Sequence, residues 1–345
     1  MTFAVAPAPH EVAPNSVARV MRLVIFALVP AIVMQVVFMG PGSIVQIVLG
    51  TATALASEAV ALKFRKQPLR PFLTDYTAVI TALLLALCLP PLAPWWLVVS
   101  GTAFAILLAK HLYGGMGANP FNPSMVGYAV LLVSFPAQLA HWLPPNVSGL
   151  QTVQFGFGDV LQTIFTGQPP ARFAWDAITS PTPLDTVRTG LTMGQTMQEI
   201  HAGDIWGMMG GRGWEWINLA TLVGGVWLLI ARVIRWHIPV AVLVGIAVPA
   251  AVMYSIDPGS YPGSMFHLTS GATMLGAFFI ATDPVSAATS DRGRLFYGLG
   301  IGFITYIIRT WGGYPDGIAF AVLFMNAAVP LIDRYTIPRV YGRER

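Results

Sequence analysis

Charged residues are scarce in this chain: Asp, Glu, Lys and Arg make up 10% of its 345 residues, whereas soluble proteins average about 25%. This scarcity argues against a soluble globular protein. Hydrophobic residues make up 55% of the sequence and gather in runs of roughly 17–25 residues, the length that an α-helix needs to cross a bilayer. Because these runs do not alternate between apolar and polar residues, we do not expect a transmembrane β-barrel.

Cysteine is nearly absent. The single residue, Cys88, lies inside an apolar run, and one thiol cannot form an intrachain disulfide or supply the thiolates of a zinc or iron–sulfur site. His111 and His267 have no second histidine at ligand spacing, so we expect no metal site. A redox role must therefore use an organic cofactor or an iron–sulfur cluster that a partner holds.

The apolar runs predict an all-α polytopic membrane protein with about ten transmembrane helices, forming a single membrane domain over residues 1–345. Residues 1–20 are expected to form a retained cytoplasmic tail, because they show no basic region followed by a cleavable apolar core. The expected spans are 21–39, 43–62, 73–89, 95–110, 124–140, 214–231, 238–256, 266–284, 295–311 and 316–332.

Lys and Arg residues predict the orientation in a lipid bilayer. With the N-terminus in the cytoplasm, only Arg172, Arg188, Arg212 and Arg309 of the 19 basic residues fall on the outer side. This bias satisfies the positive-inside rule, keeps both termini in the cytoplasm and places the loop 141–213 in the periplasm of a bacterial inner-membrane protein. Because the basic residues are spread between the spans rather than massed on one face, nucleic acid is not an expected partner.

Two pairs of short segments suggest an internal repeat. Residues 74–82 (TDYTAVITA) echo residues 269–277 (TSGATMLGA), and residues 113–116 (YGGM) echo residues 311–314 (WGGY). Five helices that start inside, followed by five that start outside, would make the two halves inverted copies of each other. The sequence therefore predicts a 5+5 inverted repeat.

The first segment that could carry chemistry covers residues 114–127 (GGMGANPFNPSMVG). Asn119 and Asn122 each precede a proline, and together with four glycines these pairs prevent a regular helix. Two interpretations remain open. The segment is either a tight inner turn between two spans or a broken helix whose polar groups line a cofactor or ion site.

The second segment covers residues 269–285, where small residues permit close helix packing without any functional reason. Asp283, which precedes a proline near the inner end of a span, either caps the next segment or lines a polar pathway. Glu58 and Lys110 lie near inner span ends, where snorkelling would account for them. Arg309, near an outer span end, is either interfacial or holds a phosphate or carboxylate.

The third segment covers residues 177–185 (AITSPTPLD) in the outer loop. Its hydroxyl cluster consists of Thr179, Ser180 and Thr182. Taken alone, such a cluster predicts a polar turn whose hydroxyls bond the local backbone.

Three separated strings resemble the D subunit of the Rnf electron-transport complex, a family that includes the related B subunit of the sodium-translocating NADH:quinone reductase. They are KHLYGGMGANPFNPSMVGY at residues 110–128, TSPTPL at residues 179–184 and GATMLGAFFIATDPV at residues 271–285. The resemblance covers nearly the whole chain, including the span count and the position of the long outer loop.

The resemblance implies a covalent FMN, joined through its phosphate to a threonine hydroxyl by an extracytoplasmic flavin transferase. Thr273 ends a literal Ser-Gly-Ala-Thr match to the attachment motif, but it falls within a span that a transferase cannot reach. Thr182 lies in the accessible loop and is therefore the preferred residue, although Pro181 stands where the family commonly has alanine. Arg188, nearby in sequence, is expected to pair with the phosphate.

The resemblance further implies a noncovalent riboflavin among the helices. It also implies a membrane electron-transfer subunit of a translocase that couples electron transfer between ferredoxin and NAD to Na+ or H+ movement. The chain lacks a Rossmann fingerprint and a cysteine cluster, so nicotinamide, iron–sulfur and further flavin sites are expected in partner subunits. On physics alone, a ten-helix solute channel or secondary transporter fits equally well, and a scaffold without a cofactor is a third hypothesis.

Overall fold

The computed structural model describes residues 16–147, 149–150 and 155–336. Within these ranges the regular elements are helices, with an isolated β-bridge between Trp206 and Gly211. Five helical segments are long and apolar enough to cross a membrane, and three shorter apolar helices accompany them. The described part of the chain thus confirms the predicted all-α polytopic class. Most of the predicted tail lies outside the described residues.

Each expected span coincides with a helix or with consecutive helices, arranged in two halves around the 141–213 loop. The first half contains α1 (Val17–Met39), α2 (Gly42–Phe64), α3 (Leu69–Leu73), α4 (Thr77–Leu87), α5 (Trp95–Phe104), the π-helix η1 (Ala105–His111), α6 (Pro123–Ser134) and α7 (Pro136–Leu139). The loop contains four short helices, namely α8 (Phe157–Thr166), α9 (Trp175–Ile178), α10 (Pro183–Thr192) and α11 (Met197–His201). The second half contains α12 (Trp214–Ile230), α13 (His237–Ile256), α14 (Ser264–Thr269), α15 (Thr273–Leu275), the π-helix η2 (Gly276–Ile280), α16 (Asp291–Trp311) and α17 (Ile318–Thr336).

Local capping residues fix where several of these helices begin. The Ser16 hydroxyl accepts a backbone N–H at the start of α1, and the Ser290 hydroxyl does the same for α16. The Asn122 side chain caps α6, and Pro123 occupies the first helical position, where its missing N–H carries no penalty. The second Asn-Pro pair therefore starts a helix rather than interrupting one.

The third span of each half is broken in the same register. Residues 74–76 separate α3 from α4, and residues 270–272 separate α14 from α15. Tyr76, with φ 65°, and Gly271, with φ 60°, adopt the left-handed conformation that ends a run of right-handed helix. They hold equivalent places in the sequence echo, which agrees with the predicted inverted repeat. The break at residues 74–76 falls at the start of the expected span 73–89, whereas the break at residues 270–272 interrupts the expected span 266–284.

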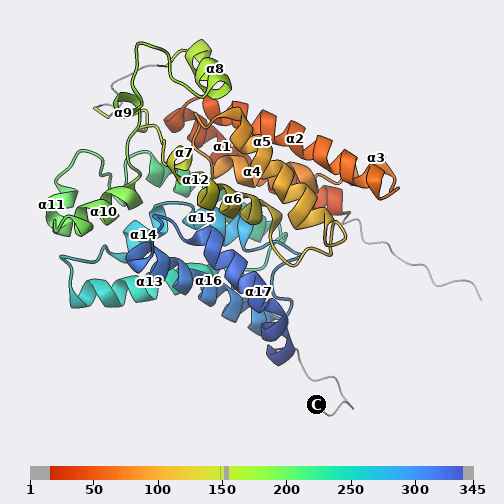
Figure 1. Ribbon diagram of the computed structural model, residues 1–345. Helices are drawn as coiled ribbons and strands as arrows, with labels where there is room; N and C mark the ends of the chain where they lie inside the picture. The colour runs from red at the N-terminus through yellow and green to blue at the C-terminus, as the bar shows by residue number, and fades with distance from the viewer. Residues whose placement is uncertain (1–15, 148, 151–154, 337–345) are drawn as a thin grey trace, which may run out of the picture.

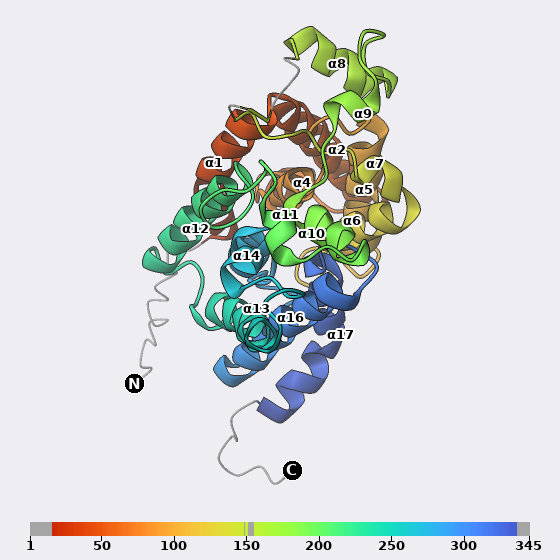
Figure 2. The same cartoon turned by 90° about the vertical axis from the view of Figure 1, so that its left-hand side faces the viewer.

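The helices form one bundle with the loop at one end. Helix α1 packs against α12 and so joins the halves, α2 packs on α4 and α5, and α13 packs on α16. The loop helices α10 and α11 lie side by side at the left end of the bundle in Figure 1, and α8 lies apart from them at the top, whereas α3 and the last turn of α17 lie away from α10 and α11. Viewed from the loop end, α10 and α11 lie across the boundary between the two halves (Figure 2).

Glu58 on α2 and Lys110 on η1 form a buried ion pair. Their exposed fractions are 1% and 3%, so the snorkelling explanation was wrong: both side chains point into the first half instead of reaching the interface. No local pattern signals this pairing, because the distance of each residue from a span end says nothing about which helix it faces.

Candidate functional site

Thr182 is the N-cap residue of α10. Its Oγ1 accepts the backbone N–H of Asp185 at 3.2 Å and donates to the Asp185 carboxylate at 2.8 Å. Pro183 follows at the first helical position. A capping threonine must keep its hydroxyl at the helix end, so the local sequence places this oxygen at the N-terminus of α10, half-buried and in the loop.

Thr179 and Ser180 bond the local backbone, as the polar-turn hypothesis predicts. The Thr179 hydroxyl donates to the Trp175 carbonyl at 2.8 Å, and the Ser180 hydroxyl lies 3.4 Å from the Pro181 carbonyl oxygen. The Ser180 backbone N–H donates to the Trp142 carbonyl at 2.9 Å. These bonds tie the segment before Thr182 to the end of the first half.

Helix α10 is held in place by a small apolar core of its own. Leu184, Val187, Met197 and Ile200 of the loop pack together with Phe266 of α14. Leu184 therefore anchors the first turn of α10 to the second half of the membrane domain. Apolar burial of this kind contributes stability in proportion to the area removed from water, and it fixes the direction in which Thr182 faces.

Beneath α10 lies a cavity of about 320 Å³, which we call the outer cavity. Thr182, Asp185 and Arg188 form part of its rim on the α10 side. Its walls come from both halves of the chain and include the aromatic residues Tyr128, Trp142, Trp214 and Tyr314, and the polar residues Gln35, Asn218, Thr221 and Asp316. The structure thus brings Thr182 and Arg188 to one cavity, whereas Thr179 and Ser180 stand outside its lining.

Arg188 is half-buried at this rim. In the part of the chain that the structure describes, its guanidinium forms no ion pair. A cation that faces a cavity without a protein counter-ion favours an anionic ligand group. This geometry supports the role predicted for Arg188.

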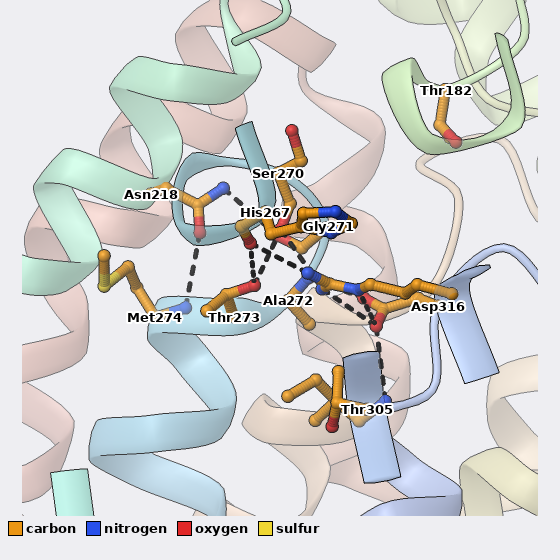
Figure 3. Close-up of polar contacts among 12 residues, drawn as sticks. Thr182, Asn218, His267, Ser270, Gly271, Ala272, Thr273, Met274, Thr305 and Asp316 are labelled. Atoms are coloured by element: carbon orange, nitrogen blue, oxygen red, sulfur yellow. Dashed lines mark hydrogen bonds and ion pairs between the residues drawn. The ribbon is translucent and has the colours of Figure 1, made fainter. Parts of the chain in front are cut away.

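Thr273, the alternative attachment residue, is fully buried, with an exposed fraction of 0%. Its hydroxyl donates to the carbonyls of His267 and Ser270, at 2.7 and 2.9 Å. Figure 3 shows it enclosed beneath the break of the third span, with Thr182 separate in the loop above. Both hydroxyls are hydrogen-bonded, so the preference for Thr182 is supported by the burial of Thr273 alone.

The break at residues 270–272 is held by side chains from α12, from α16 and from the connection between α16 and α17. The Asn218 amide donates to the carbonyls of Thr269 and Gly271, at 3.0 and 3.1 Å. Arg309 pairs with Asp316 at 3.0 Å. Of the two interpretations of Arg309, the structure selects the one in which it holds a carboxylate. Asn218 and Asp316 were missed by the sequence reasoning, and the GG-containing string just before Asp316 was the only nearby signal.

Asn119, Asn122 and Asp283 line a second cavity, of about 470 Å³, which we call the inner cavity. The Asn122 amide donates to the Ile280 carbonyl at 3.1 Å and so joins the two halves. The Asp283 carboxylate accepts the Ser286 hydroxyl at 2.7 Å and the Val285 backbone N–H at 3.4 Å, which makes it a local cap. Of the predicted site residues, Thr182 and Arg188 therefore line the outer cavity and these three line the inner one, whereas Thr179, Ser180 and Thr273 line neither.

Taken together, these features define a polytopic α-helical membrane protein with ligand-sized cavities between its two halves, one beneath the loop and one toward the other end.

The model of the NQR2, RnfD, RnfE family matches residues 4–342, and the chain belongs to this family. It is 50% identical over 353 residues to the D subunit of the ion-translocating oxidoreductase complex of Escherichia fergusonii, covering 100% of both chains. It is also 50% identical to the proteins of that name from Citrobacter koseri, over 350 residues and 99% of both chains, and Pectobacterium carotovorum, over 353 residues and 100% of both. The resemblance seen in the sequence is thus confirmed.

Proposed function

We propose that the chain is the membrane subunit of an ion-translocating oxidoreductase complex and that it carries an FMN joined through its phosphate to Thr182. The relatives that share its full length bear the name of such a subunit. The observation that carries the cofactor assignment is the position of the Thr182 hydroxyl, at the rim of a cavity whose lining also contains the Arg188 guanidinium.

The residues at the rim fit a phosphoester. A phosphate on Thr182 would lie at the N-terminus of α10, where the helix dipole and free N–H groups favour negative charge. Arg188, six residues after Thr182 on the same helix, supplies a cation. The Asp185 carboxylate opposes an anion here, so attachment requires the Thr182–Asp185 hydrogen bond to be given up.

The outer cavity also fits a planar ring system. Its volume of about 320 Å³ is at the lower end of the range for ligand sites, about 300–1,000 Å³. Trp142, Trp214 and Tyr314 supply apolar walls, while Gln35 and Thr221 supply hydrogen-bonding groups for ring edges. The bound flavin would supply electron transfer, and the chain's own residues would orient its ring and exclude water.

In this proposal the chain works between ferredoxin and NAD in a bacterial inner membrane, and the complex moves Na+ or H+. Iron–sulfur and further flavin sites belong to partner subunits, and an extracytoplasmic transferase installs the FMN. The inner cavity, lined by polar side chains from both halves, is the proposed place for a noncovalent riboflavin. Both termini are proposed to be cytoplasmic and the 141–213 loop periplasmic, which agrees with the loop lying at the end of the bundle away from α3.

The rival hypothesis of a solute channel gains support from the inverted repeat and the broken spans. However, at the break between α14 and α15 (residues 270–272), which we call the outer break, hydrogen bonds from side chains reach the carbonyls of His267, Thr269, Ser270 and Gly271. Carbonyls that are already satisfied are poor ligands for a passing ion. This favours a structural role for the outer break and supports the redox function.

The proposal is tested by flavin fluorescence of the purified chain in a denaturing gel, after co-expression with a flavin transferase. We expect a fluorescent band that disappears in Thr182→Ala and persists in Thr273→Ala. Thr192→Ala is the matched control, because Thr192 is an exposed threonine at the other end of α10. A wild-type band without fluorescence, or a Thr182→Ala band that keeps it, would overturn the assignment.

A further inference from the structure

Asp316 lies in the connection between α16 and α17 and has contacts with three parts of the second half. One carboxylate oxygen accepts the Ala272 backbone N–H at 2.8 Å, just after the break. The other accepts the Ile318 N–H at 3.2 Å and the Arg309 Nη2 at 3.0 Å. Figure 3 shows Asp316 at the centre of this cluster.

Arg309 and Asp316 differ in their access to the outer cavity. The Asp316 side chain is 21% exposed and lines the cavity, whereas the Arg309 side chain is 1% exposed and does not belong to the lining. Arg309 uses its remaining N–H groups on the carbonyls of His267 and Ser270, at 2.8 and 3.3 Å. The Asp316 carboxylate therefore faces the cavity, and the Arg309 guanidinium that pairs with it is buried away from the cavity.

Because Gly271 has no side chain, Leu184 at the start of α10 can approach the Arg309–Asp316 pair closely. A Cβ built on Gly271 would collide with Asp316 Oδ2, and it would lie 2.7 Å from a Leu184 methyl carbon and 2.8 Å from Arg309 Nη2. Leu184 is only two residues after Thr182. The carboxylate, the buried guanidinium and the first turn of α10 thus meet at one point, under the proposed attachment residue.

We propose that Asp316 and Arg309 are positioning residues that set the reduction potential of a flavin in the outer cavity. This inference rests on the proposed function. Reduction adds negative charge to the ring, so the nearby Asp316 carboxylate opposes it and the buried Arg309 guanidinium favours it. Charges in an enclosed, largely apolar site are screened far less than charges in water, so both effects persist in the folded protein.

An electrostatic role and a purely structural role differ in the sign of their effects. Removing the Asp316 charge should shift the flavin midpoint potential to more positive values, and removing the Arg309 charge should shift it to more negative values. If the pair served only to hold the break, both substitutions would loosen the same cluster, and their effects on the potential would have the same sign or be absent.

The experiment is a potentiometric titration of the flavin absorbance in the purified, flavinylated chain, with dithionite as reductant and redox mediators, in which the covalent FMN is followed as the couple that is absent from Thr182→Ala. Asp316→Asn should give a positive shift and Arg309→Gln a negative one, while Arg309→Lys, which keeps the charge, should stay near wild type. Asp257→Asn is the matched control, because Asp257 follows α13 and does not line the cavity. It should leave the potential unchanged.

Arg309→Gln leaves a partly buried carboxylate without its partner and can fail to accumulate. The double variant Asp316→Asn/Arg309→Gln removes both charges, and its potential should then be lower than that of Asp316→Asn alone. Shifts of the same sign in the two single variants, or no difference between Asp316→Asn and the double variant, would overturn the inference while leaving the covalent flavin intact. A wild-type chain without flavin would instead overturn the proposed function and this inference with it.

Discussion

The ammonium group of Lys110 lies 2.9 and 2.8 Å from the two carboxylate oxygens of Glu58, a residue 52 positions earlier in the chain. A third bond runs from the same ammonium to the Thr77 hydroxyl at 2.9 Å, at the first residue of α4. The pair therefore joins α2 and η1 to the start of α4, the helix that follows the break at residues 74–76. In the second half, the Arg309–Asp316 pair makes the corresponding contacts at the break at residues 270–272.

Replacing Lys110 by Met should strongly destabilise the protein, because the Glu58 carboxylate would stay buried without its main counter-charge. Removing one partner of a buried pair typically costs about 3–5 kcal/mol. The double variant Glu58→Gln/Lys110→Met should recover most of that loss. Denaturant unfolding in detergent micelles would measure both, with the exposed Lys63→Met as the control, which should change stability by no more than about 0.5 kcal/mol. Equal losses in Lys110→Met and Lys63→Met would contradict the assignment.

Gly271→Ala should cost more stability than Gly117→Ala. Both glycines have positive φ, 60° and 87°, and a non-glycine residue in such a conformation costs on the order of 1–3 kcal/mol. A Cβ at Gly117 meets no atom within 4 Å, whereas one at Gly271 meets Leu184, Arg309 and Asp316. The same unfolding measurement compares the two variants. If Gly117→Ala proved as damaging as Gly271→Ala, the packing of α10 onto the break would be incorrect.

Cys88 provides a native reporter for the outer cavity, because it is the only cysteine in the sequence and it lines that cavity. A flavin ring in the cavity should slow the reaction of this thiol with N-ethylmaleimide. We therefore expect Thr182→Ala, which lacks the covalent FMN, to be labelled several-fold faster than the flavinylated wild type, as followed by intact-protein mass spectrometry. The two proteins should react at the same rate after denaturation. Equal rates in the folded state would place the ring outside the cavity.

The positions of the spans followed from the sequence because length and apolar composition alone decide whether a helix can cross a bilayer. The burial of Thr273 also followed, since a residue inside a span is enclosed by its neighbours, whereas the attachment of FMN to Thr182 stays a prediction. The repeat was visible in the sequence because residues 74–82 echo residues 269–277. In the structure, the left-handed residues Tyr76 and Gly271 stand at equivalent places in these two strings.

Side-chain pairing across the fold could not be obtained in this way. Glu58 and Lys110, or Asn218 and the carbonyl of Thr269, are separated by about fifty residues, and no local pattern encodes which distant helix a polar group will face. Asp316 shows the same limit: it lies in a short connection, and its importance arises only when Arg309 and the break are brought beside it. The loop helices were also missed, because their apolar faces are short: α10 and α11 pack on each other, and α8 packs on α2.

Asn326 connects the second Asn-Pro pair, Asn122 and Pro123, to the second half of the chain. Its side-chain oxygen accepts the Asn122 backbone N–H at 3.1 Å, and its amide donates to the Ser286 carbonyl at 3.0 Å and the Tyr297 hydroxyl at 2.7 Å. Asn326→Leu leaves these buried groups without their partner, at about 1–3 kcal/mol for each unsatisfied group. Tyr297→Phe removes one partner only and should cost less, and the exposed Asn146→Leu should cost least. Thermal unfolding of the three purified variants gives the order, and a Tyr297→Phe loss as large as that of Asn326→Leu would show that Asn326 does not join the halves.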